Sequence, residues 1–373
     1  MTSIATLADL RSARRLVIKV GSALLVERGA PRAEWLATLA DEIAELRRHA
    51  EVIVVSSGAI ALGAARLGLA KGGRGSLADA QAAASVGQVE LARLWSDALG
   101  LHAITAAQML VTLGDLEDRR RYLNASATLA RLLEAGALPV VNENDSVATE
   151  EIRFGDNDRL AARVAQAAGA DAVLLLSDVD GLYDRDPREA DALLVAKVEG
   201  VTPEVMAMAS GASSSGLGSG GMRAKLQAAQ IAERAGIALV IANGTHLSPL
   251  ARALDQGIGT LFVPQVDASA RKAWLGGRLA PAGVLSVDAG CMIALDQGAS
   301  VLAAGIIDVE GDFARGDLVA VHGPKGERLG QGLVEYTAGE CRAILGLRQD
   351  QQAERLGYAP RAAVIHRDHM VRT

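Results

Sequence analysis

Lys19 and Lys225 each stand next to small residues in a way that suits phosphate binding. Lys19 closes an apolar stretch and precedes Gly21 and Ser22, whose backbone N–H groups could meet a ligand. Lys225 follows a loop rich in Ser and Gly, about one turn into a predicted helix whose N-terminus attracts anions. Taken alone, Lys19 could equally extend its ammonium group to solvent, and the loop could be a surface linker. Together the two lysines predict a polyphosphate site.

The glycine-rich loop has the spacing Gly216-x-Gly218-x-x-Gly221, which matches the dinucleotide fingerprint. That fingerprint requires a strand directly before its first glycine, and a Ser-rich segment stands there instead. The loop also lacks the Lys-Ser or Lys-Thr pair of a P-loop. The sequence therefore disfavours a nicotinamide-dependent oxidoreductase.

Acid and amide side chains gather in two short windows, and small polar residues follow two further apolar stretches. The seven acid or amide residues are Asn142, Glu143, Asn144, Asp145, Asp156, Asn157 and Asp158. Such residues form turns, but this density exceeds what turns require and suits an ammonium group, an amide or Mg²⁺. Ser57-Gly58 and Ser177-Asp178 follow the other two stretches, where a ligand site and an ordinary capping turn are both open.

The remaining residue types favour phosphoryl transfer. The six histidines are scattered, and the cysteines Cys291 and Cys341 are far apart, so neither a nucleophilic triad nor a His/Cys metal site is indicated. Phosphoryl transfer needs mainly positioning and positive charge, and it needs no base when the acceptor is already ionised. A carboxylate, with a pKa of about 4, meets that condition. We therefore expect a kinase for a carboxylate or another ionised acceptor.

Alternating strands and helices must position these groups. Nearly continuous apolar runs predict parallel strands that are covered on both faces, at 16–20, 51–56, 102–106, 138–142, 172–176 and 237–242. Helices are predicted at 32–48, 77–99, 121–134, 159–167 and 222–234. This order predicts an α/β fold with an open, mainly parallel sheet between helices, and ligands at the carboxyl ends of the strands.

After residue 263 the pattern becomes β-rich, with frequent Gly and Asp turns. Short strands are predicted at 284–287, 300–302, 306–309, 318–321, 332–336 and 362–366. We expect a catalytic domain over 1–263, a linker over 264–280, a small β-rich domain over 281–361 and an extension over 362–373.

Composition excludes several other classes. The chain has 373 residues, a net charge of −6 and 50% hydrophobic residues, which argues against a disordered chain or a mainly electrostatic nucleic-acid binder. No apolar run approaches the roughly 18 residues of a membrane span. We expect a cytoplasmic protein without a membrane segment.

The combined motifs resemble those of the bacterial glutamate 5-kinases over almost the whole chain. The resemblance is carried by residues 17–22, 56–61, 84–88, 142–147, 155–158, 181–183, 216–225 and 281–288. It implies an amino acid kinase domain followed by a PUA domain. It also implies transfer of phosphate from ATP to L-glutamate in proline biosynthesis, with Mg²⁺ accompanying ATP, feedback inhibition by proline, and a homodimer or homotetramer.

The resemblance further implies a role for each matching residue. Lys19, Lys225 and Asp158 would be catalytic, with Asp158 orienting both lysines. Glutamate would be bound by Ser57, Gly58, Asp145, Asp156 and Asn157. The ATP site would be lined by Lys19, Gly21, Ser22, Ser177, Asp178, Ser219, Gly220, Gly221, Met222, Arg223, Ala224 and Lys225. No protein ligand to Mg²⁺ is implied.

Small departures from the family pattern occur on the nucleotide side. Ser177 and Ser219 stand where threonine is usual, and both keep a hydroxyl group. The pair Arg223-Ala224 replaces a small pair that contains threonine, which could alter nucleotide affinity.

Two rival functions differ from this hypothesis. Another kinase of the same fold, acting on carbamate, aspartate, acetylglutamate or a nucleotide, is disfavoured by residues 142–145 and 155–158 and by the C-terminal domain. An RNA-binding protein is disfavoured because residues 271–361 contain 10 basic and 11 acidic residues, so their net charge is not positive. The same residues include only four aromatic side chains on which bases could stack.

Overall fold

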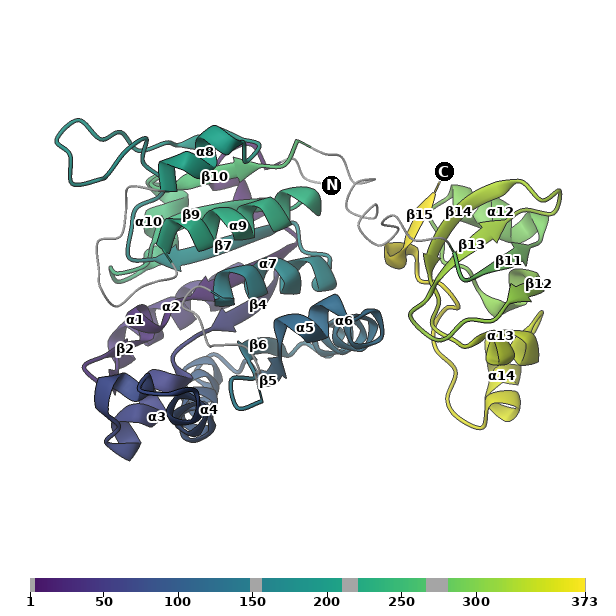
Figure 1. Ribbon diagram of the computed structural model, residues 1–373, viewed down its shortest axis with the longest axis horizontal. Coiled ribbons are helices and arrows are strands. Elements are labelled where there is room, and N and C mark those ends of the chain that lie inside the picture. Colours follow the sequence, from purple (N-terminus) through teal and green to yellow (C-terminus); the bar gives the residue numbers. More distant parts are fainter. Residues whose placement is uncertain (1–3, 148–155, 210–220, 266–280, 373) are drawn as a thin grey trace. The chain divides into compact units, whose positions relative to one another are not determined.

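The computed structural model describes residues 4–147, 156–209, 221–265 and 281–372. The chain divides into two compact units, each with its own hydrophobic core (Figure 1). The first unit comprises residues 1–116 and 125–266, and the second comprises residues 117–124 and 267–373. Each unit is described by itself below.

An eight-stranded sheet forms the centre of the first unit. Its strands lie in the order β5 (Ala106–Val111), β6 (Leu138–Glu143), β4 (Glu51–Ser56), β1 (Arg15–Val20), β7 (Ala172–Ser177), β9 (Ala238–Asn243), β10 (Thr260–Val263) and β8 (Lys197–Glu199). The first six strands are mutually parallel, whereas β10 runs antiparallel to β9 and parallel to β8. The expected open, mainly parallel sheet is confirmed.

Helices cover both faces of this sheet. The helices of this unit are α1 (Ser22–Leu25), α2 (Ala33–Leu46), α3 (Ala59–Leu67), α4 (Leu77–Gly100), α5 (Leu113–Glu117), α6 (Arg119–Glu134), α7 (Asp156–Ala168), α8 (Pro203–Met208), α9 (Gly221–Arg234) and α10 (Pro249–Asp255). The start of α6, residues 119–124, belongs to the second unit. Short elements complete the first unit: β2 (Val26–Glu27), β3 (Ala30–Pro31), and the 3₁₀ turns Ala8–Ser12 and Ala70–Gly73.

Alternation along β1 determines which face each side chain meets. Leu16, Ile18 and Val20 belong to the core that also contains the apolar faces of α2, α4 and α10. Successive side chains of a strand point to opposite faces, so Lys19 faces the other layer. That layer contains α7 and α9, which pack side by side over the sheet (Figure 1).

Two glycines bring α3 and α4 into backbone contact. A Cβ atom at Gly87 would lie 1.8 Å from the carbonyl oxygen of Ala59, and one at Gly63 would lie 1.8 Å from that of Ala83. Glycine is required at both positions because no side chain fits between the two backbones. Helix α4 is therefore held in one position against the start of α3.

Several strand predictions were wrong in position. Residues 101–103 form the turn after α4, with Ala103 at a φ of 56°, and the strand begins only at Ala106. As an edge strand, β5 exposes part of its surface, including Gln108, so the search for a fully apolar run missed it. The short strands β8 and β10 were not predicted.

The second unit contains a five-stranded sheet. Its order is β12 (Ile306–Gly311), β11 (Gly283–Val287), β13 (Leu318–His322), β14 (Arg328–Leu333) and β15 (Met370–Arg372), and every pair is antiparallel except β11 with β13. The helices α12 (Ala289–Asp296), α13 (Ala338–Ile344) and α14 (Gln349–Leu356) accompany it, with 3₁₀ turns at Ala303–Gly305 and Arg367–His369.

Strands predicted near the chain's end also differ from the structure. Residues 332–336 overlap only the last part of β14, and the predicted strands at 300–302 and 362–366 meet in one isolated bridge, Val301 with Ile365. The final strand of the sheet lies farther along, at β15.

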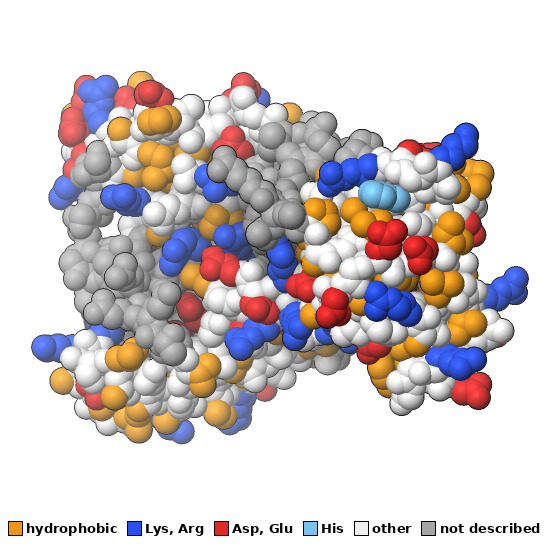
Figure 2. Space-filling view, turned by 45° about the vertical axis from the view of Figure 1, so that its right-hand side comes forward, with side chains coloured by type: hydrophobic (Ala, Val, Ile, Leu, Met, Phe, Trp, Pro, Cys, Tyr) orange, Lys and Arg blue, Asp and Glu red, His pale blue; other side chains and the backbone are white. Residues whose placement is uncertain are grey.

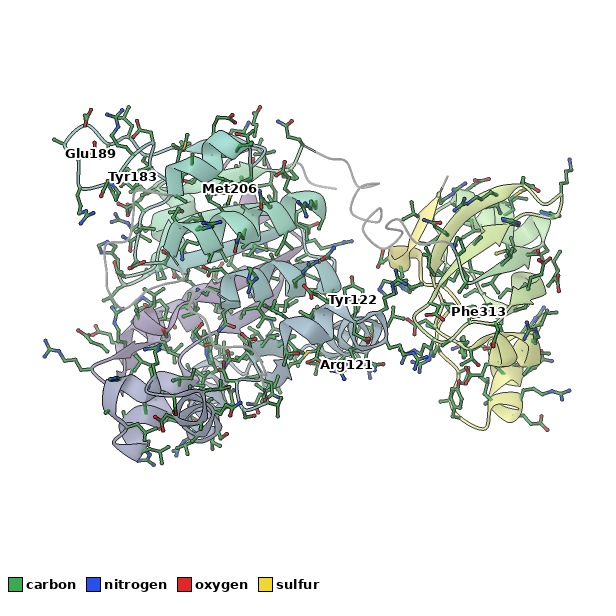
Figure 3. The ribbon with its side chains drawn as sticks, viewed as in Figure 1. Arg121, Tyr122, Tyr183, Glu189, Met206 and Phe313 are labelled. Carbon is green, nitrogen blue, oxygen red and sulfur yellow. The ribbon has the colours of Figure 1, made fainter. Side chains whose placement is uncertain are left out.

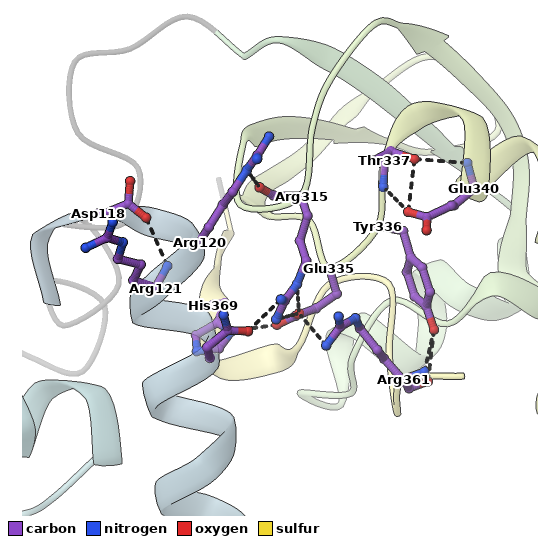
Figure 4. A network of polar contacts seen from close by, with 11 residues as sticks. Asp118, Arg120, Arg121, Arg315, Glu335, Tyr336, Thr337, Glu340, Arg361 and His369 are labelled. Atoms are coloured by element: carbon purple, nitrogen blue, oxygen red, sulfur yellow. Dashed lines mark hydrogen bonds and ion pairs between the residues drawn. The ribbon is translucent and has the colours of Figure 1, made fainter. Parts of the chain in front are cut away.

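Polar contacts stabilise the second unit around Glu335 (Figure 4). The guanidinium group of Arg315 donates to one oxygen of Glu335 from both Nε and Nη2, at 3.1 and 2.9 Å. Thr337 and Glu340 form a capping box that begins α13. On the face drawn in Figure 2, the coloured side chains of this unit mix basic, acidic and apolar types.

Within the part of the chain that the structure describes, no helix combines the length and the apolar character needed to cross a membrane.

Candidate active site

The candidate site lies where the parallel strands of the first unit end. Strand β1 is flanked by β4 and β7, with Val20 opposite Ser56 on one side and Leu176 on the other. The carboxyl ends of parallel strands meet at the same edge of a sheet, which is where ligands bind in open α/β folds. The polar residues that follow β1, β4, β6 and β7 therefore lie along one edge.

Lys19, Asp158 and Lys225 form a buried charged cluster at this edge. The Nζ atom of Lys19 lies 2.5 Å from Oδ1 of Asp158, and the Nζ atom of Lys225 lies 3.0 Å from Oδ2 of the same residue. Asp158 is 1% exposed and Lys19 is 6% exposed. Strand β1 supplies Lys19, α7 supplies Asp158 and α9 supplies Lys225, so the packing of α7 against α9 brings the cluster together.

Burial and charge act against each other in this cluster. Burial opposes ionisation of Asp158, but the ammonium groups of Lys19 and Lys225 together lower the pKa of its carboxyl group below the ordinary value. Burial lowers the pKa of Lys19, and Lys225 acts in the same direction, while Asp158 opposes the shift. At neutral pH Asp158 therefore remains a carboxylate.

The cluster carries an excess of positive charge. Within these three buried or half-buried residues two ammonium groups face one carboxylate, and the exposed carboxylate of Asp178 also acts on Lys19. Electrostatic attraction is stronger in a buried site than in bulk solvent. The arrangement suits a phosphate chain, which would bring the missing negative charge.

A second polar group lies one residue away on α7. Nδ2 of Asn157 donates to Oγ of Ser57 at 2.6 Å and to Oδ1 of Asn142 at 3.2 Å. Nδ2 of Asn142 in turn donates to Oε1 of Gln88 at 2.8 Å. Gly58, beside Ser57, has a φ of 121°, a conformation that strains any other residue.

The acceptor atom of Asn157 takes no part in these hydrogen bonds. Its Oδ1 atom is buried and has no hydrogen-bond partner among the described residues. A buried carbonyl oxygen without a partner is costly, so it marks a place where a ligand donor would be favourable. The ammonium group of an amino acid is such a donor.

The ends of β7 and β9 form the other side of the site. Ser177 closes β7, and its hydroxyl lies 3.3 Å from Oδ1 of Asp178. Nδ2 of Asn243, at the end of β9, donates to Oδ1 of Asp180 at 3.1 Å, which ties the two strand ends together. Tyr183 and Glu189 mark the loop that continues from β7 (Figure 3).

The predicted site residues fall along this edge as follows. Gly21 and Ser22 begin α1, and Gly221, Met222, Arg223 and Ala224 begin α9 ahead of Lys225. Asp145 lies half-buried in the turn after β6. Asp156 begins α7, but its side chain lies outside the description. Ser219 and Gly220 lie outside the described residues.

Gln88 was not predicted as a site residue, and Asn142 was noted only as one member of a polar window. Asn142 gave a usable signal because it is a polar residue, 2% exposed, at the end of an apolar strand. Gln88 lies in the segment 84–88 that carries the family resemblance, but nothing assigned it a role, because it lies in the middle of a helix and contacts a residue 54 positions away.

The described residues contain no group of three or more His, Cys, Asp or Glu side chains placed to hold a metal ion.

Comparison with known proteins agrees with this geometry. A model of the amino acid kinase family matches residues 14–243, and a model of the PUA domain matches residues 283–352. Glutamate 5-kinase of Novosphingobium aromaticivorans is 62% identical over 373 residues, which is 100% of this chain and 99% of that protein. Those of Sphingopyxis alaskensis and Zymomonas mobilis are 58% and 52% identical, each over 96% of this chain and over 98% and 91% of the relatives. The chain therefore belongs to the amino acid kinase family, within it to the glutamate 5-kinases, and carries a C-terminal PUA domain.

Proposed function

We propose that this protein transfers the γ-phosphoryl group of ATP to the γ-carboxylate of L-glutamate, as the first step of proline biosynthesis from glutamate. The observation that carries the proposal is the buried cluster of Lys19, Asp158 and Lys225 beside Asn157 and its free acceptor. Similarity over the full chain to glutamate 5-kinases supports the same reaction.

In the proposed reaction, an oxygen of the γ-carboxylate attacks the γ-phosphorus of ATP in line with the bond to ADP. A carboxyl-phosphate bond forms, the bond to the β-phosphate oxygen breaks, and ADP leaves with the electron pair. The carboxylate is already ionised at neutral pH, so no general base is needed. Lys19 and Lys225 would stabilise the negative charge that spreads over the transferring group.

We assign the surrounding residues by the same logic. Ser57, Gly58, Asp145, Asp156 and Asn157 would bind glutamate, with Asn157 Oδ1 accepting from its ammonium group. The residues Gly21, Ser22, Ser177, Asp178 and Ser219 to Lys225 would bind ATP. The second substrate would be ATP with Mg²⁺, which would neutralise part of the charge of the phosphates.

The remaining expectations are also proposals. We propose a catalytic domain over 1–263, a linker over 264–280, a PUA domain over 281–361 and an extension over 362–373, which the matched ranges 14–243 and 283–352 support. Inhibition by proline, a dimeric or tetrameric state and a cytoplasmic setting rest on the resemblance to the family. Glutamate titrations with added proline, and light scattering, would test the first two.

Replacing Lys19 by alanine tests the proposed role of the cluster. The Lys19→Ala variant should lose at least about 100-fold in kcat, because one charge-stabilising group typically contributes that much. The measurement is glutamate-dependent release of ADP. Lys197→Ala, which removes an exposed lysine on β8 paired with Glu199, should stay within about twofold of the wild type. A near-normal kcat of Lys19→Ala would show that the assignment is wrong.

A further inference from the structure

Whether Asn157 turns its carbonyl oxygen or its NH₂ group toward a ligand depends on hydrogen bonds beyond the residues that would bind the substrate. Both donors of its amide are used, toward Ser57 and Asn142, and its acceptor has no hydrogen-bond partner among the residues that the structure describes. The hydroxyl of Ser57 can donate or accept, so it does not decide which way the amide is turned. The oxygen of Asn142 can only accept, so the orientation of Asn142 decides which atom of the Asn157 amide faces it.

Asn142 is itself an amide that could be turned either way. Its Nδ2 atom donates to Oε1 of Gln88 at 2.8 Å, and this bond directs Oδ1 of Asn142 toward Asn157. If Asn142 turned over, its NH₂ group would face Asn157, whose carbonyl would then turn inward to accept. The NH₂ group of Asn157 would be left facing the substrate, and it would repel an ammonium group.

We propose that Gln88 is a positioning residue for glutamate. With its Oε1 atom toward Asn142, Gln88 favours the orientation in which Asn142 accepts from Asn157, and Asn157 then presents a carbonyl oxygen to the substrate ammonium group. The inference rests on the proposed function, because it takes glutamate as the ligand of Asn157. We call Gln88, Asn142 and Asn157 the amide network.

The backbone that carries Gln88 is suited to this task. The preceding residue, Gly87, places the α4 backbone in direct contact with α3 at Ala59. Helix α3 begins immediately after Ser57 and Gly58, the other partners of the site. Gln88 and Ser57, which accepts a hydrogen bond from Asn157, therefore lie beside two helices whose backbones are in direct contact.

The experiment compares glutamate with glutarate, which has the same two carboxylates and no amino group. In Gln88→Met the side chain keeps its length and loses its strong acceptor, so we expect the kcat/KM for glutamate to fall about tenfold or more. The kcat/KM for glutarate and the KM for ATP should stay within about twofold. Gln88→Glu keeps an acceptor and should restore the preference for glutamate.

Two controls separate this role from a structural one. Val89→Met places the same side chain at the next, exposed position of α4 and should behave as the wild type in both assays. The thermal midpoint of each variant shows whether it is folded. Parallel losses on glutamate and glutarate in Gln88→Met, or no loss on either, would overturn the proposal. A wild-type protein that phosphorylates neither compound would instead overturn the proposed function.

Discussion

Asp158 holds the ammonium groups of two lysines close together in a largely buried site. Lys19 and Lys225 lie 2.5 and 3.0 Å from its two oxygens. Removing one partner from a buried ion pair costs about 3–5 kcal/mol, because the remaining charge is left without compensation. Both lysines therefore depend on Asp158, and a bound phosphate chain would complete the balance of charge.

The burial of Lys19 predicts how its ammonium group titrates. Burial lowers its pKa below the ordinary value of 10.5, so its ammonium group should lose the proton at a lower pH than a free lysine. The kcat/KM for glutamate should be retained below that pKa and lost as the pH rises through it. With only six lysines in the chain, ¹³C-lysine NMR can follow the titration, and Lys19→Ala identifies the resonance.

Asp158→Asn provides the control for this titration. The carboxylate of Asp158 holds the pKa of Lys19 up, so its removal should lower that pKa further. A Lys19 resonance that titrates at 10.5 or above in the free protein would contradict this account of the cluster.

The contact between helices α3 and α4 holds the side of the candidate site that contains Ser57 and Gln88. Gly63 and Gly87 leave no space for a methyl group between the two helices. Ser57 and Gly58 precede α3, and Gln88 follows Gly87 on α4, so a shift of either helix would displace Ser57, which accepts from Asn157, or Gln88, which accepts from Asn142.

Gly87→Ala should therefore destabilise the fold and impair glutamate binding together. A Cβ atom there would lie 1.8 Å from the carbonyl oxygen of Ala59, and overpacking of this kind typically costs about 1–3 kcal/mol. Urea denaturation measures the free energy of unfolding, and initial rates give the KM for glutamate, which should rise. Gly100→Ala, at the end of the same helix with open space around it, should change neither. Equal behaviour of the two variants would refute the proposed contact.

The elements that position the site differed in how well the sequence predicted them. Strands β1, β4 and β7 were predicted correctly, because strands buried on both faces appear as continuous apolar runs. The edge strand β5 was misplaced, because one of its sides is exposed and its pattern includes Gln108. Lys19, Asp158 and Lys225 could be proposed from their motifs, whereas the link from Gln88 to Asn142 depends on how α4 packs against the sheet.

At the scale of the whole molecule, two anionic substrates must bind to a protein with a net charge of −6. The positive charge is concentrated instead at Lys19, Lys225 and the start of α9. The C-terminal β-rich region has no comparable excess, since residues 271–361 contain 10 basic and 11 acidic residues.

This balance predicts that the full-length protein does not bind RNA tightly. Protein–RNA affinity depends strongly on neutralising phosphates with basic side chains, and the second unit offers a mixed surface (Figure 2). A gel-shift assay with total tRNA at low salt should show no stable complex. Tight binding that weakens as salt is added would contradict the prediction and support an RNA-related role for the PUA domain.

Glutamate-dependent ADP release, measured across a panel of acceptors, shows whether the protein phosphorylates the γ-carboxylate of glutamate. The wild-type protein with MgATP should release ADP with L-glutamate and only weakly with aspartate, acetylglutamate, carbamate or a nucleoside monophosphate. Added hydroxylamine should trap the acyl phosphate as a hydroxamate in step with ADP. Comparable or faster release with another acceptor, or ADP formed from glutamate without hydroxamate, would contradict phosphorylation of the glutamate γ-carboxylate.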